Sequence, residues 1–128
     1  MNFLLDTNTI IYYMDGTLTP DGYTVVLNAL QNKECALSVI SEIEVLGFQF
    51  PDADQEAKAQ KFVQSLTILP LTDEIVRKTI EIRKLRKIKV ADAIIAASAV
   101  LGRLTLISRN EKDFNNLPGL NFINPFDL

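Results

Sequence analysis

The chain has 128 residues, of which 48% are hydrophobic and 23% are charged, and its formal net charge is −3. This length suits one core, so we expect residues 1–128 to form a single domain. The sequence has no histidine, which excludes a Ser-His-Asp triad and removes the commonest general base and zinc ligand. The negative charge argues against broad electrostatic adhesion to nucleic acid, so binding of nucleic acid would need a local basic patch.

The chain carries neither a bilayer-spanning apolar run nor a leader-like start. A membrane helix needs ~18 consecutive apolar residues, and the first residues contain no basic stretch with a cleavage site. We therefore expect a cytoplasmic protein that makes no contact with a membrane. The single cysteine, Cys35, adjoins an apolar run and is expected to be a buried structural thiol.

The first half of the chain alternates between short apolar runs and helical patterns. Residues 2–5 predict a strand, followed by a helix that closes at Asp15-Gly16 and a second helix that ends near Asn32. Residues 36–38 predict the next strand, which leads into a helix over about 40–48 that Pro51 interrupts. An amphipathic helix over 54–66 follows.

The second half continues the alternation. Residues 67–71 predict a strand, and Thr72 is a good N-cap for a helix to about Lys87. Residues 91–101 are apolar nearly all round, which indicates a buried helix that Gly102 can end. Strands are expected at 104–108 and 121–123. The pattern predicts an α/β fold, a three-layer α/β/α sandwich with a mainly parallel sheet of four to five strands.

Acidic residues follow the predicted strands, at the edge where open parallel sheets bind ligands. Asp6 follows the first strand, Glu44 lies on the helix after the second, and Asp113 comes after the fourth. Asp92 opens the buried helix that precedes the fourth strand. We therefore expect these four carboxylates to converge on one edge of the sheet.

Each of these acids also has a simpler interpretation. Asp6 and Asp92 could be helix caps, because aspartate fills that role well. Glu44 could lie on the solvated side of an amphipathic helix, and Asp113 could be a surface turn residue. Their joint placement favours a site over four independent coincidences.

Four sequence blocks resemble, in order and spacing, the motif blocks of PIN-domain proteins, and most of all the VapC-type toxins of bacterial type II toxin-antitoxin pairs. The blocks are Asp6-Thr7-Asn8 and the segments 38–46, 91–99 and 108–114. Each block is weak alone, whereas the four together are specific. The resemblance extends from the first residue to the last strand and implies a PIN-like fold.

The resemblance implies a Mg²⁺- or Mn²⁺-dependent endoribonuclease whose ligand positions match Asp6, Glu44 and Asp92, with Asp113 at the fourth acidic position. Carboxylate oxygens also favour these hard cations over zinc. A bound ion would supply an activated water and stabilise in-line displacement at a phosphodiester. The polar positions expected to orient the carboxylates are Thr7, Asn8, Ser41, Ser108 and Asn110.

The chain departs from the family pattern at three places. Ser41 stands where threonine is commoner, and Val90-Ala91 stands where many relatives have a proline before the acid. Asn110 occupies a position that is acidic in some relatives, so a second metal ion is expected to bind weakly. None of these departures removes one of the four acids.

A basic run precedes Asp92 and is a candidate guide for the RNA backbone, with little readout of bases. The alternative is a helix C-terminus with cations that suit the helix dipole. The run consists of Arg83, Lys84, Arg86, Lys87 and Lys89. Tyr12, Tyr13, Phe48 and Phe50 are expected in the core or an interface rather than as base-stacking platforms.

The resemblance also implies partners: an RNA substrate, a second copy of the chain in a homodimer, and a VapB-like antitoxin whose C-terminal segment fills an apolar groove. A catalytically silent PIN module that binds RNA or a protein partner is the alternative function. A phosphoacceptor receiver domain is disfavoured, because Asp6 has no acidic neighbour and no lysine follows Lys112.

Overall fold

The computed structural model describes residues 2–128, which contain one five-stranded sheet and seven helices. All strand pairs are parallel, and the strand order is β3-β2-β1-β4-β5. The strands are β1 Phe3–Leu5, β2 Cys35–Ser38, β3 Thr67–Leu69, β4 Thr105–Ile107 and β5 Asn121–Ile123. The helices are α1 Thr7–Asp15, α2 Pro20–Gln31, α3 Val39–Leu46, α4 Ala53–Gln64, α5 Asp73–Leu85, α6 Val90–Gly102 and α7 Glu111–Phe114.

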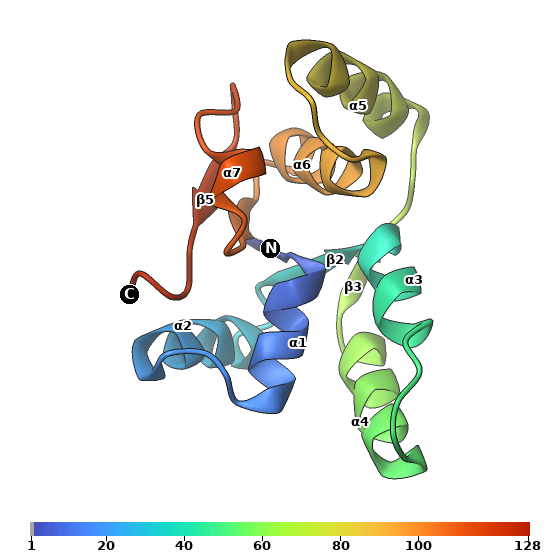
Figure 1. Ribbon diagram of the computed structural model, residues 1–128, viewed down its shortest axis with the longest axis vertical. Coiled ribbons are helices and arrows are strands. Elements are labelled where there is room, and N and C mark those ends of the chain that lie inside the picture. The colour runs from blue at the N-terminus through green and yellow to red at the C-terminus, as the bar shows by residue number, and fades with distance from the viewer. Residues whose placement is uncertain (1) are drawn as a thin grey trace.

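The sheet is the middle of three layers (Figure 1), which confirms the predicted α/β/α sandwich. Side chains alternate across each strand, so neighbouring residues enter different cores. Leu4 and Leu106 pack beneath α5 and α6, whereas Leu5 and Ile107 pack beneath α1, α2 and α4. Because both faces are covered, the strands are buried apolar runs, as parallel strands usually are.

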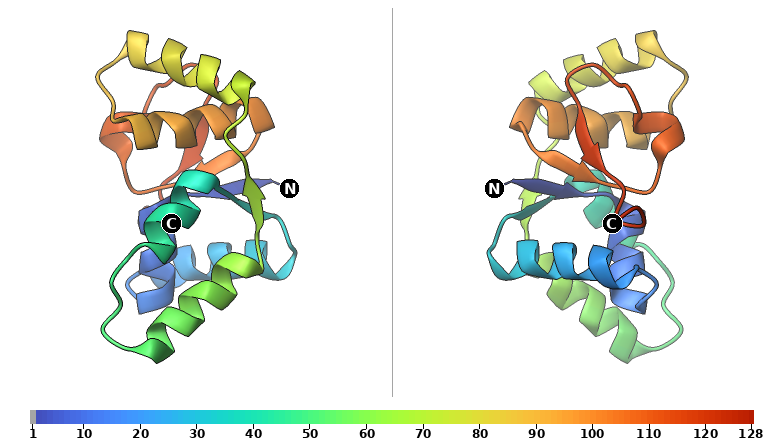
Figure 2. Two further views of the ribbon diagram at one scale, coloured as in Figure 1. Left: turned by 90° about the vertical axis from the view of Figure 1, so that its right-hand side faces the viewer. Right: turned by 90° about the vertical axis from the view of Figure 1, so that its left-hand side faces the viewer.

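The strand order reverses at β1, the central strand. The chain passes from β1 to β2 and β3 on one side, then crosses to β4 and β5 on the other. The carboxyl ends of β1 and β4 are therefore a topological switch point, where open α/β sheets bind ligands. The helix α3, the short α7 and the start of α6 lie at that end of the strands (Figure 2).

The predicted helix ends lie within two residues of the observed ones. The helix α6 ends at Gly102 as predicted, but Arg103 rather than a glycine takes the left-handed conformation, with φ of 55°. A Cβ at Gly102 would lie 3.3 Å from Leu104, so this glycine serves close packing instead. The helix α5 ends before Arg86, whose side chain binds the neighbouring α7 segment.

Cys35 is buried, as predicted, with 3% of its surface exposed. It lies in the lower core, which is the one between the sheet and helices α1, α2 and α4. Burial raises the pKa of its thiol to about 11, and the nearby Glu34 charge adds to the shift. The thiol is therefore protonated at neutral pH and is a packing group. Within residues 2–128, no helix combines the length and apolar character that a membrane span requires.

Candidate functional site

Asp6 caps one helix and also faces the site. It follows β1 directly, and its Oδ1 accepts a hydrogen bond of 2.9 Å from the backbone N–H of Thr7 at the start of α1. Its Oδ2 accepts a 2.7 Å bond from Ser108 Oγ, beyond the end of β4. Burial raises the pKa of Asp6, and the two hydrogen bonds partly oppose that shift. The capping interpretation is thus correct for Asp6, but it accounts for one oxygen only.

Glu44 is joined to the site through Thr7. Thr7 Oγ1 donates to Glu44 Oε1 at 2.7 Å and lies 2.9 Å from Ser41 Oγ. A hydroxyl has one proton and a carboxylate only accepts, so Ser41 is the donor in the pair with Thr7. Glu44 is exposed, as the amphipathic interpretation expected, yet its carboxylate is held beside the carboxyl end of β1.

Asp92 lies in the first turn of α6 but does not cap it. The N-cap is Lys89, which makes no capping hydrogen bond through its side chain. Burial, and then the charges of Asp6, Asp113 and Glu44, together raise the pKa of Asp92 to about 6, against the opposing effect of Lys89. The capping interpretation of Asp92 is therefore wrong. The other three carboxylates thus lie within electrostatic range of Asp92.

Asp113 is positioned by the asparagine that caps its helix. Asn110 Nδ2 donates to Asp113 Oδ2 at 2.9 Å, and Asn110 Oδ1 accepts from the backbone N–H of Asp113 at 3.2 Å. The backbone N–H of Asn110 donates to Ser108 Oγ at 3.0 Å. Ser108 therefore joins Asp6 to the α7 segment. Asp113 belongs to a short helix rather than to the turn that the simpler interpretation expected.

The donor set fits a hard divalent cation in its chemistry, because it is all oxygen and its members repel one another. The side chains are not arranged as a formed metal cage. In the part of the chain that the structure describes, no three acidic or cysteine side chains form a group with metal-binding geometry. Both oxygens of Asp6 and Oε1 of Glu44 accept hydrogen bonds instead.

The predicted basic run is divided between structural and exposed residues. Arg83 Nε donates to the backbone oxygen of Ile88 at 3.1 Å. A guanidinium nitrogen of Arg86 donates to the backbone oxygens of Asp113 and Asn115, both at 2.9 Å. Arg86 thus fastens the end of α5 to α7. Within the run, Lys84, Lys87 and Lys89 are exposed, and Lys89 lies close enough to act on Asp92.

The polar residues of the motif blocks differ in what they do. Four of the five predicted residues make hydrogen bonds within the site: Thr7, Ser41, Ser108 and Asn110. Asn8 is exposed, and its side chain is in none of the hydrogen bonds found at the site. Sequence reasoning missed Thr9, whose Oγ1 donates to Ile107 O at 2.8 Å and ties α1 to β4.

Sequence reasoning also assigned no role to Arg109, although it stands inside the fourth block. Its guanidinium lies 4.0 Å from the ring centre of Phe126. That contact joins residues 17 positions apart (126 − 109) across a strand, so local spacing gives no signal for it.

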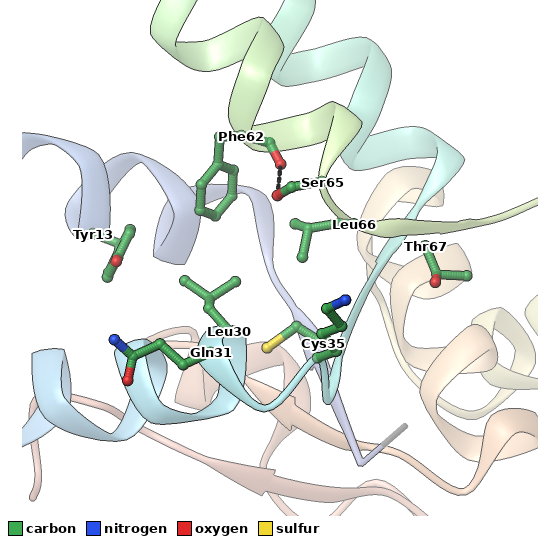
Figure 3. A pocket seen from close by; sticks show the side chains of 9 residues that line it. Tyr13, Leu30, Gln31, Cys35, Phe62, Ser65, Leu66 and Thr67 are labelled. Atoms are coloured by element: carbon green, nitrogen blue, oxygen red, sulfur yellow. Dashed lines mark hydrogen bonds between the residues drawn. The ribbon is translucent and has the colours of Figure 1, made fainter.

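Two hollows in the described part of the chain have linings that include none of the four acids. A cavity of about 370 Å³ is bordered by Cys35 and Thr67, the first residues of β2 and β3, with Leu30 and Phe62 beside it (Figure 3). It is therefore at the amino ends of the strands and has no acidic lining residue but one lysine, Lys33. An apolar groove of about 570 Å³ lies between α1, α3 and α4. Its lining includes Ile11, Met14, Val45, Phe48 and Phe50.

The aromatic residues that were expected in the core or an interface follow that expectation in part. Tyr12 and Tyr13 pack against the core beneath α1 and α2. Phe48 is 58% exposed and packs edge-on against Phe50 beside the apolar groove, with their ring centres 5.1 Å apart.

The fold and site define a class: a three-layer α/β protein with a parallel sheet and an acidic cluster at its topological switch point. Residues 3–120 match the family model of the PIN domain, and the chain belongs to the PIN-domain family. This confirms the family that the four motif blocks predicted. Among curated proteins, none matches the chain.

Solved structures extend this finding. A chain of a toxin-antitoxin complex from Klebsiella pneumoniae is 30% identical, with a TM-score of 0.80 over 99% of this chain and 100% of that one. A chain of VapBC2 from Rickettsia felis, bound to a promoter DNA fragment, is 26% identical with a TM-score of 0.80, over 97% and 98%. A chain of DNA-bound VapBC from Salmonella typhimurium shares the fold at 22% identity and a TM-score of 0.82, over 98% of both chains. These likenesses support a VapC-type PIN-domain protein.

Proposed function

We propose that this chain is a Mg²⁺- or Mn²⁺-dependent endoribonuclease and the toxin of a VapBC-type pair. The observation that carries the proposal is the placement of four carboxylates at the switch point, where burial and then the charges of Asp6, Asp113 and Glu44 raise the pKa of Asp92 to about 6. Acids that repel one another at a sheet edge are stabilised as carboxylates by a cation. The absence of histidine leaves carboxylates with a metal as the hydrolytic chemistry that this sequence can supply.

In the proposed enzyme, Asp6 and Asp92 hold the principal ion, and Glu44 and Asp113 complete or extend its shell. A bound divalent ion supplies an activated water and stabilises charge at the phosphodiester. The chain's own residues orient the acids: Ser108 holds Asp6, and Asn110 holds Asp113. These hydrogen bonds limit the rotation of the carboxylates, which is how groups around a metal site tune it.

Two further residue sets are assigned to the substrate and to stabilising the site. The exposed Lys84, Lys87 and Lys89 are proposed to attract the RNA backbone, because they offer charge beside an otherwise acidic edge. Thr7 and Ser41 are proposed to hold Glu44 in place.

The solved relatives support an antitoxin partner for this chain, since the similar chains come from toxin-antitoxin complexes. We propose that the apolar groove between α1, α3 and α4 receives a VapB-like segment. Its exposed apolar residues, such as Phe48, are of the kind found at protein interfaces. We also propose a homodimer, as the family resemblance implies, and a cytoplasmic location.

The test uses Asp6→Asn, because asparagine is as good an N-cap as aspartate and the helix should keep its start. We expect the wild-type chain with Mg²⁺ or Mn²⁺ to cleave RNA into products with 5′-phosphate and 3′-hydroxyl ends. Asp6→Asn and excess chelator should each abolish cleavage. A cyclic phosphate product, or full cleavage in excess chelator, would contradict the proposed mechanism.

The second candidate is a PIN module that binds RNA or a protein without cleaving it. It is favoured by one observation: in residues 2–128 the acids accept hydrogen bonds and form no group ready to bind a metal. Such a module would bind its partner equally well with Asp6→Asn and would show no metal-dependent cleavage. Measuring binding and cleavage on the same two proteins separates the two functions.

A further inference from the structure

Arg109 is held in a fixed place at the carboxyl edge of the sheet. It directly follows Ser108, the residue that donates to Asp6. Its guanidinium carbon lies 4.0 Å from the ring centre of Phe126 and 5.9 Å from that of Tyr12. The two rings pack edge-on, with their centres 5.2 Å apart. Stacking on two aromatic rings restricts an arginine that is otherwise exposed.

The C-terminal segment that supplies Phe126 is itself fastened to the fold. Thr19 Oγ1 donates to Pro125 O at 3.0 Å, and Phe126 N donates to Asn124 Oδ1 at 2.9 Å. A Cβ at Gly22 would lie 2.1 Å from Pro125 O, so α2 approaches this segment at a distance that only glycine allows. The ring of Phe126 is therefore a positioned platform rather than a loose terminus.

The charge of Arg109 is not used within the described part of the chain. The two ion pairs found in residues 2–128 join Lys58 to Asp54 and Lys78 to Glu81. Arg109 is also not among the charges that shift the pKa of Asp6 or Asp92, although Lys89 is. Arg109 thus lies in the chain between two residues that bind the acids, Ser108 and Asn110, while its guanidinium stays outside the acidic cluster with its charge available to a ligand.

We propose that Arg109 binds a backbone phosphate of the RNA next to the one that is cleaved, and that Phe126 positions it for this contact. The inference rests on the proposed nuclease function and deepens it. A stacked guanidinium still presents the N–H groups along its edge, which suit two phosphate oxygens at once. The four acids repel phosphates. A cation at their flank therefore favours one placement of the RNA strand relative to the acids. Arg109 is accordingly a positioning residue for substrate.

The experiment compares Arg109→Gln with Arg103→Gln, which removes the same charge elsewhere. Arg103 is exposed and follows the last residue of α6, whereas Asp92 lies in the first turn, roughly 16 Å away along the helix axis. Steady-state cleavage of single-stranded RNA with Mg²⁺ gives KM and kcat. Salt titrations of RNA binding, made on an Asp92→Asn background that cannot cleave, give the number of phosphate contacts.

For Arg109→Gln we expect KM to rise about tenfold, kcat to stay within about twofold, and the salt slope to fall by about 0.7, the value for one phosphate on a single strand. Phe126→Leu keeps the apolar packing but removes the ring, so KM should rise about two- to fivefold. Arg103→Gln should change none of these quantities.

An Arg109→Gln protein with wild-type KM and salt slope would overturn the inference. Metal-dependent cleavage by the wild type would in that case still support the proposed nuclease function. A fall in kcat at constant KM would also overturn it, because it would place Arg109 in the chemical step. Wild-type protein that neither binds nor cleaves RNA would overturn both proposals together. Thermal unfolding of each variant establishes that it is folded, and Arg109 is exposed, so its substitution should not affect the core.

Discussion

The two edges of the sheet carry opposite kinds of features. The amino edge has a cavity of about 370 Å³ beside Cys35 and no acidic lining, and its thiol is kept protonated by burial. The carboxyl edge has the four acids, of which Asp6, Glu44 and Asp113 are joined by hydrogen bonds through Thr7, Ser108 and Asn110.

A hollow by itself therefore does not mark the edge of the sheet where the four acids lie. Parallel strands all end at the same edge, so residues that follow several strands meet there whatever their separation in sequence. Burial and neighbouring charges raise the pKa values of Asp6 and Asp92 at this edge, and such shifts are typical of functional sites.

The largest expected effect is on the rate of RNA cleavage, which should depend on an acid at the carboxyl edge and not on one at the amino edge. Asp92→Asn at the carboxyl edge should lower metal-dependent RNA cleavage by at least about a hundredfold, since even groups around a metal shell cost ~10–100-fold when removed. Glu34→Gln changes the charge by the same amount next to β2 at the amino edge and should leave the rate unchanged. Equal losses in the two variants would remove the functional distinction between the edges.

At Cys35, on the amino edge, we expect a substitution to lower stability and to leave RNA cleavage unchanged. Cys35→Ser places a hydroxyl in the buried lower core, and an unpaired buried hydroxyl costs about 1–3 kcal/mol of the free energy of unfolding. RNA cleavage at a temperature where the variant is folded should be unchanged. Urea unfolding measures the loss, with Ser65→Ala at the exposed rim of the same cavity as the control, expected within about 0.5 kcal/mol. A Cys35→Ser protein of full stability but low activity would contradict the assignment.

Arg86 tests whether part of the basic run is structural. Arg86→Ala removes hydrogen bonds to the backbone oxygens of Asp113 and Asn115 and should lower the free energy of unfolding by about 1–2 kcal/mol. Lys87→Ala removes an exposed neighbour and should change it by less than about 0.5 kcal/mol. If urea unfolding gives the same stability for both variants, Arg86 does not fasten α5 to α7.

The smallest effect is a dependence of stability on pH. The pKa of Asp92 is raised from 3.8 to about 6 in the folded chain, which therefore binds more protons than the unfolded chain between these values. The contribution of Asp92 is fully present below about pH 4 and is lost as the pH rises through 6. Without metal, Asp92→Asn should thus raise the urea midpoint relative to wild type more at pH 7 than at pH 4.

Added Mg²⁺ should raise the midpoint of the wild type at pH 7 and have little effect at pH 4, where protonated acids bind cations poorly. The Asp92→Asn variant is the control and should respond less to Mg²⁺. A difference between the two proteins that is the same at both pH values would contradict the raised pKa of Asp92.

Much of the fold was predictable because its signals are local. Apolar runs bounded by turn formers indicated every strand, and Thr72 capped α5 as its side-chain chemistry suggested. The positions of the acids after the strands were also readable, since a parallel sheet puts those positions at one edge. The strand order beyond the switch point and the exact helix ends were not, because they depend on packing between distant elements.

The sequence by itself determined the layered α/β fold and the edge of the sheet that carries the acids. It also excluded histidine as a general base or metal ligand beside them. The tertiary structure alone decided what each neighbouring side chain does. In the folded chain Asp6 is both a helix cap and a member of the site, whereas Asp92 does not cap α6. Arg86 binds the backbone of the α7 segment. Arg109 lies over the ring of Phe126. The physical reason is that hydrogen bonds and stacking act over a few ångströms, and only folding brings residues so far apart in sequence within that range.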